Sequence, residues 1–131
     1  MNREILFRGK RIDNGEWVTG DLLHPLNAKT SDMFIQPIGY GANKLACVDP
    51  DTVGQFTGKI DNITGRKVFE DDILSVHFKG ECFSHIGSVK YSEGMFYVEI
   101  DTGKYTFMDL YVLDADIEVI GNVYDKLSEE K

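Results

Sequence analysis

The chain has 131 residues, of which 42% are hydrophobic and 27% charged, as in an ordinary globular protein. It carries 14 Lys and Arg against 22 Asp and Glu, a net charge of −8. This charge disfavours general DNA binding, because non-specific affinity for DNA comes from Lys and Arg. The apolar runs are far shorter than the roughly 20 residues of a membrane span, and the charged first residues predict no signal peptide. With only Cys47 and Cys82, we expect a cytoplasmic protein with reduced thiols.

The charge is unevenly distributed along the chain. Residues 1–60 carry seven basic and seven acidic side chains, whereas residues 61–131 carry seven basic and fifteen acidic ones. The first residues nevertheless form a local basic cluster: Arg3, Arg8, Lys10 and Arg11. This cluster is a candidate contact for nucleic-acid phosphates. A strand edge whose charges block unwanted pairing explains the same residues and is the favoured interpretation.

Short runs of Val, Ile, Phe, Tyr and Thr separated by glycines are typical of strands joined by tight turns. The first predicted hairpin joins Phe7–Ile12 to Trp17–Thr19 through Asp13-Asn14-Gly15. Three further strands and their two turns predict a meander: Val89–Tyr91, Ser92-Glu93-Gly94, Met95–Ile100, Asp101-Thr102-Gly103 and Lys104–Met108. No segment has the apolar spacing of a long helix.

Alternating residues predict one buried face for each of three strands: Leu74, Val76 and Phe78; Phe96, Val98 and Ile100; Ile117, Val119, Gly121 and Val123. We therefore expect an all-β fold of two small β subdomains with little helix. The first spans residues 1–66 and the second residues 67–125, with the size of an SH3-like barrel and the Asp61–Lys67 segment as the link. Residues 126–131 form a charged tail.

A metal site is the first chemistry to consider. His77, Cys82 and His85, with Glu81 nearby, have the residue types of a zinc site with three protein ligands. Structural zinc usually needs four ligands from two paired motifs, and a surface loop explains this single cluster as well. Glu70-Asp71-Asp72 offers carboxylates for Mg²⁺ or for acid–base catalysis, but these residues are also typical of a turn before a strand. We predict no metal and no cofactor.

Two further activities are weakly indicated. Cys47 or Cys82 has no nucleophile motif around it, although His24, His77 and His85 are available as bases. The glycine-rich Gly39–Lys44 segment lacks the second half of a phosphate-binding loop, and no helix follows it. We therefore predict no catalytic residue. Tyrosines and carboxylates in the acidic half instead suggest a protein-interaction face: Tyr97, Tyr105, Tyr111, Asp114, Asp116 and Glu118.

The segment Pro50-Asp51-Thr52-Val53-Gly54-Gln55-Phe56-Thr57-Gly58, followed by Asp61, Gly65 and Val68–Leu74, closely resembles the signature of the YopX family. The blocks Arg3–Lys10 with Trp17–Leu22, and Glu118–Asp125, resemble the opening and closing strands of that family. The resemblance implies an all-β protein of two subdomains in a phage or prophage context, and it implies no activity. The family usually has Gly where Asp71 stands, which puts the geometry of that turn in question.

Within this signature we expect turn architecture around a core phenylalanine, built by Pro50, Thr52, Gly54, Phe56, Gly58 and Gly65. The expected function is that of a non-enzymatic accessory protein in the cytoplasm of a bacterial host. It would bind a host or phage protein, basic in character, and would form a homo-oligomer, with no membrane association. The alternative is a nucleic-acid module that uses the N-terminal basic cluster.

Overall fold

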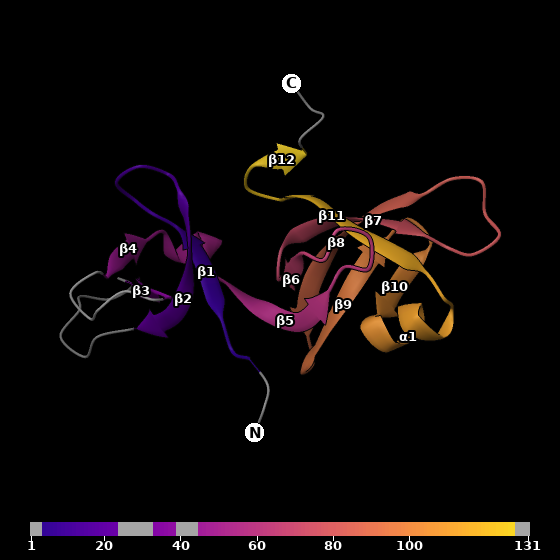
Figure 1. Ribbon diagram of the computed structural model, residues 1–131, viewed down its shortest axis with the longest axis horizontal. Coiled ribbons are helices and arrows are strands. Elements are labelled where there is room, and N and C mark those ends of the chain that lie inside the picture. The colour runs from indigo at the N-terminus through magenta and orange to yellow at the C-terminus, as the bar shows by residue number, and fades with distance from the viewer. Residues whose placement is uncertain (1–3, 24–32, 39–44, 128–131) are drawn as a thin grey trace. The chain divides into compact units, whose positions relative to one another are not determined.

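The computed structural model describes residues 4–23, 33–38 and 45–127 (Figure 1). These residues form two antiparallel sheets with one short α-helix and one 3₁₀ helix, so the expected all-β class is confirmed. The chain divides into two compact units between Phe56 and Thr57. Strand β5 (Gly54–Ile60) crosses this boundary. Within the described residues, no helix has the length and apolar character needed to cross a membrane.

The first unit is an antiparallel sheet in the order β4-β3-β2-β1-β5. Its other strands are β1 (Phe7–Lys10), β2 (Trp17–Leu23), β3 (Met33–Pro37) and β4 (Ala46–Val48). The predicted first hairpin is confirmed, because β1 pairs with β2 and Gly15 adopts a φ of 74° in the turn. Among the described residues of this unit, five apolar side chains are buried: Leu6, Ile35, Ala46, Val48 and Phe56.

The signature segment of the first unit forms a 3₁₀ turn before β5. Helix η2 (Pro50–Thr52) begins at Asp49, whose side chain accepts a hydrogen bond from the Asp51 N–H. The buried Thr52 hydroxyl accepts a hydrogen bond from the Lys10 N–H at 2.9 Å and donates one to the Asp49 carbonyl at 2.7 Å. Thr52 therefore holds the turn against β1, which gives a structural reason for this part of the motif.

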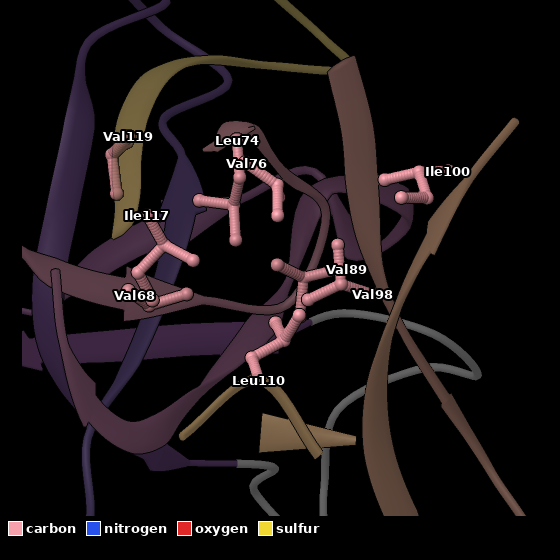
Figure 2. Close-up of a cluster of buried hydrophobic side chains, with 9 residues drawn as sticks. All are labelled: Val68, Leu74, Val76, Val89, Val98, Ile100, Leu110, Ile117 and Val119. Atoms are coloured by element: carbon pink, nitrogen blue, oxygen red, sulfur yellow. The ribbon is translucent and has the colours of Figure 1, made fainter. Parts of the chain in front are cut away.

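The second unit contains a sheet in the order β10-β9-β8-β7-β11-β12. Its strands are β7 (Asp72–His77), β8 (His85–Ser92), β9 (Met95–Ile100), β10 (Gly103–Thr106), β11 (Asp116–Asn122) and β12 (Lys126–Leu127). Strand β6 (Lys67–Phe69) pairs with the end of β5. Several strands and helix α1 (Phe107–Val112) contribute to the core of the second unit, which Figure 2 shows. Its buried residues are Val68, Leu74, Val76, Val89, Val98, Ile100, Leu110, Ile117 and Val119.

Four expectations for the second unit need correction. The SH3-like barrel is not confirmed, because the sheet is open with β10 and β12 at its edges. Alternation along a strand shows which face is buried, but not whether the end strands meet. The register of β11 shifts between Val119 and Gly121, which turns Val123 out to 42% exposure. The strand expected up to Met108 ends at Thr106, where α1 begins. The predicted tail contributes β12 before the described residues end.

The boundary between the units lies earlier than the predicted one at residues 66 and 67. Residues 57–66 belong to the second unit because Asp61 and Asn62 bond to β11. The Asp61 carboxylate is buried in the turn between β5 and β6. It accepts hydrogen bonds from the N–H groups of Ile63, Thr64, Gly65 and Val119 and from the Thr64 hydroxyl. The signature therefore includes a carboxylate that ties this turn to the sheet.

Asp71 occupies a left-handed position in the turn before β7, with a φ of 71°. This explains why glycine suits the place, since an L side chain is strained there. Asp71 compensates in part, because its carboxylate accepts a hydrogen bond from the Tyr124 hydroxyl at 2.9 Å. Its N–H also donates to the Val89 carbonyl, and its carbonyl accepts from the Val123 N–H.

Replacing Asp71 by Ala is expected to destabilise the protein by about 1 kcal/mol, because the left-handed strain remains and the Tyr124 bond is lost. Replacing it by Gly removes both the strain and the bond, so stability should stay within about 0.5 kcal/mol of the parent. Urea unfolding of the two variants and of Tyr124→Phe measures how much the backbone strain and the hydrogen bond to Tyr124 each change the free energy of unfolding. Equal losses for Ala and Gly would contradict the importance of the backbone conformation.

Candidate protein-interaction site

Helix α1 is placed by a capping box at its first turn. The Thr106 hydroxyl accepts a hydrogen bond from the Asp109 N–H at 3.1 Å, and the Asp109 carboxylate accepts one from the Thr106 N–H at 2.9 Å. The helix packs beside β10 and β9 and directs Leu110 into the core (Figures 1 and 2). The helix ends at Val112 with Leu113 as its C-cap, and Asp114 then reverses the chain with a φ of 57°.

Most apolar side chains of this helix are exposed. Tyr111 is 81% exposed and Met108 is 65% exposed, whereas Leu110 is only 3% exposed. Val112 and Leu113 are exposed as well. The helix has one buried anchor and three exposed large apolar side chains, and Leu113 at its C-cap is a fourth. Met108, Tyr111 and Val112 are three and four residues apart, so they share one helix face and form an apolar patch. Contiguous patches of this kind mark interaction surfaces more often than scattered single residues do.

A groove of about 380 Å³ lies beside the helix. Six of its lining residues define it: Ile60, Asn62, Met108, Leu110, Tyr111 and Ile117. The Asn62 side chain fixes one wall, because its carbonyl accepts the Ile117 N–H at 2.8 Å and its amide donates to the Asp116 carboxylate at 3.0 Å. The groove therefore has a mostly apolar lining and a carboxylate held beside it. We call these residues and the exposed face of α1 the α1 groove.

The six residues of the predicted interaction face do not share one surface. Tyr105 packs on the core side of the sheet, with its ring 5.4 Å from that of Phe78. Tyr97 lies on the opposite face of the sheet, where the Lys104 ammonium is 5.4 Å from its ring. Strand register places Asp116 and Glu118 on that outer face as well. Only Tyr111 lines the α1 groove, and Asp114 and Asp116 lie close to it in the chain.

The N-terminal basic residues lie on the first unit, except for Arg3, which is outside the described residues. Arg8 and Lys10 share one face of β1 with Trp17 of β2, at 4.9 Å and 5.8 Å from its ring centroid. Arg11 is held by both carboxylate oxygens of Asp13, at 3.0 Å and 2.9 Å. The structure thus groups Arg8 and Lys10 around an aromatic ring and pairs Arg11 with an acid.

The residues of the proposed zinc cluster have other roles. The His77 Nε2 lies 2.8 Å from the Glu81 carbonyl, and Cys82 is exposed. His85 is buried between two carboxylates, with Nδ1 2.7 Å from Asp101 and Nε2 3.0 Å from Glu81. In the part of the chain that the structure describes, no three His, Cys, Asp or Glu side chains come together in a way that could hold a metal ion.

The remaining candidates for catalysis or phosphate binding either have structural contacts or lie outside the described residues. Asp71 and Asp72 are engaged in turn contacts, since the buried Asp72 carboxylate accepts the Phe69 N–H at 2.7 Å and Asp71 bonds to Tyr124. Cys47 is half-buried in β4. His24 and the Gly39–Lys44 segment lie outside the described residues.

The hydrogen bonds that His85 donates to the Asp101 and Glu81 carboxylates raise the pKa of His85 above its usual value, with Asp101 the larger cause. A raised pKa in the folded state stabilises the fold fully below the unfolded value of about 6.5, and this stabilisation is lost as the pH rises through the folded pKa. The melting temperature of the protein should therefore fall as the pH is raised above about 6.5, and His85→Gln should abolish this part of the dependence. His77→Gln is the control, and an identical loss there would contradict the assignment.

The α1 groove was missed in the sequence because its residues come from a predicted strand and from a linker. One local signal was present, since Thr106 and Asp109 have the spacing of a capping box just before the apolar run at 110–113. No comparable signal connects Ile60 and Asn62 to the helix, because they approach it only through the tertiary fold.

These features define an all-β chain with an exposed apolar groove on its second unit. The family model described as YopX protein matches residues 6–127. The chain therefore belongs to the YopX family, as the resemblance in its signature segments implied. The comparison with curated proteins and the comparison with solved structures each gave no match.

Proposed function

We propose that this YopX protein is a non-enzymatic accessory protein that binds another protein of the host or phage through the α1 groove. The observation that carries the proposal is the exposure of Met108 and Tyr111 beside a groove of about 380 Å³. Exposed tyrosine next to an apolar pocket is the arrangement from which interface hot spots are built. If the partner is a second copy of the chain, the protein is a homo-oligomer.

The proposal is tested by capturing partners from host lysate with the tagged protein, with and without nuclease. A double variant, Met108→Ala with Tyr111→Ala, should lose the captured protein, whereas Met95→Ala with Tyr91→Ala should keep it. The control residues are both 53% exposed and lie on other elements of the same unit. Unchanged capture by the groove variant, at an unchanged melting temperature, would contradict the proposal.

A second candidate function is single-stranded nucleic-acid binding by the first unit. Trp17 supports it, because an aromatic ring flanked by Arg8 and Lys10 combines a stacking surface with positive charge. The net charge of −8 weighs against it. Trp17 is the only tryptophan of the chain and therefore reports binding directly.

For this candidate, a poly-dT oligonucleotide should quench Trp17 fluorescence in a salt-sensitive way, and Arg8→Ala with Arg11→Ala should weaken the quenching. Arg11→Ala alone is the matched control, since Asp13 already holds that guanidinium. Unchanged fluorescence at low salt would count against nucleic-acid binding.

A further inference from the structure

We infer that the α1 groove recognises a protein segment with a large apolar anchor flanked by Lys or Arg. This inference rests on the proposed function and adds the class of partner. The groove lies at the small end of the range for binding pockets, and its lining includes Met108, Leu110, Ile117 and Tyr111. A short anchor of one or two apolar side chains matches this volume and lining.

The net negative charge of the second unit favours basic residues around that anchor in the partner. Residues 57–131 carry eight Lys and Arg against fifteen Asp and Glu. A field of this sign favours the approach of basic segments and disfavours acidic ones. Charge complementarity therefore makes a basic segment the partner, rather than a neutral or acidic one.

Two carboxylates are next in the chain to lining residues of the groove, because Asp114 precedes Ala115 and Asp116 lies between Ala115 and Ile117. Asp114 follows the C-cap residue of the helix and is largely exposed, and its carboxylate lies 3.5 Å from the exposed Lys79 ammonium. Exposed pairs of this kind contribute little, so a partner's cation can replace Lys79 at small cost. Asp116 is held beside the groove wall by the Asn62 amide. Lys59 also lines the groove, and its charge disfavours a cation inside the groove. The partner would therefore place its apolar anchor in the groove and its cations on Asp114 and Asp116.

The inference is tested by selecting a displayed random-peptide library on the full chain, followed by binding titrations with the selected peptides. Peptides with Leu, Phe or Met next to Lys or Arg should be enriched. Their affinity should fall more than tenfold in Met108→Ala with Tyr111→Ala, as expected for hot-spot residues. It should fall about fivefold in Asp114→Asn with Asp116→Asn, an effect that high salt removes.

The charge variant keeps the local structure, because Asn tolerates the left-handed conformation of residue 114 and retains an acceptor for Asn62 at residue 116. Glu93→Gln with Glu99→Gln makes the same change in net charge at exposed sites elsewhere on the unit and should leave affinity unchanged.

Selected peptides that are apolar without basic residues would overturn the inferred partner class while leaving a protein-binding groove. Equal affinity for the Asp114 and Asp116 variant would do the same. A dimer in sedimentation velocity that Met108→Ala with Tyr111→Ala dissociates would identify a second copy as the occupant and would also overturn the inference. Selected peptides that bind the groove variant as tightly as the parent would overturn both the inference and the proposed function.

Discussion

Replacing Asp61 by Asn is expected to lower the free energy of unfolding by about 3 kcal/mol, because a buried carboxylate that accepts several hydrogen bonds cannot be matched by one amide oxygen. In the parent, one carboxylate oxygen accepts the Thr64 and Gly65 N–H groups, and the other accepts the Thr64 hydroxyl and the Val119 N–H. The Asn amide nitrogen would face one of these donors. Urea unfolding monitored by circular dichroism measures the loss.

The Asp61 carboxylate also predicts how the free energy of unfolding depends on pH. Burial on its own raises the pKa of Asp61, but the hydrogen bonds from Thr64, Val119 and Gly65 outweigh it and lower the pKa to about 2. Because the folded pKa lies below the unfolded one, the stabilisation is present above about pH 4 and is lost as the pH falls toward 2. The parent should therefore lose stability over this interval, and Asp61→Asn should lose correspondingly less.

Glu99→Gln provides the control for both measurements, since Glu99 is an exposed carboxylate of β9. Its stability and acid dependence should stay close to those of the parent. If Asp61→Asn were as stable as Glu99→Gln, the turn between β5 and β6 would not depend on the buried carboxylate.

Turns and strand faces were predictable because their causes are local. Asn14-Gly15, Glu93-Gly94 and Thr102-Gly103 mark turns in the sequence, and the structure places positive φ at Gly15, Gly94 and Gly103. Val76 and Val98 lie in the core, as predicted. Their burial was predictable because alternation along a single strand shows which side chains share the buried face, whichever strand pairs with it.

The errors share a different cause, which is competition between local pattern and tertiary contact. The residues after Lys104 are apolar and aromatic enough for a strand, yet the Thr106–Asp109 capping box starts a helix that buries Leu110. The bulge in β11 depends on the register with β7, which no residue of β11 reveals alone.

The polar centres of the second unit were equally beyond local reasoning. Asp61 meets Val119, and His85 meets Asp101, across separations at which sequence pattern carries no information. The sequence marked Asp61 as part of a family segment and His85 as a metal candidate. In the structure, Asp61 instead connects a turn to the sheet, and His85 is buried and hydrogen-bonded to the Asp101 and Glu81 carboxylates.

Replacing Leu110 by Ala is expected to cost about 3 kcal/mol of stability, as large-to-small changes in packed cores do. Leu110 is the buried residue of α1, and its carbonyl also accepts the Ala115 N–H at 3.0 Å. Losing this anchor should loosen the helix as well as the core. Hydrogen exchange at residues 107–113 should therefore accelerate more than exchange in β7 and β8.

Tyr111→Ala is the matched control, because the neighbouring side chain points to solvent on the same helix. It should change stability by no more than about 0.5 kcal/mol while weakening any ligand of the α1 groove. This contrast separates the residue that holds the helix from the one that the helix presents. If Tyr111→Ala destabilised the fold as much as Leu110→Ala, Tyr111 would be a packing residue, and the α1 groove would lose its best candidate contact.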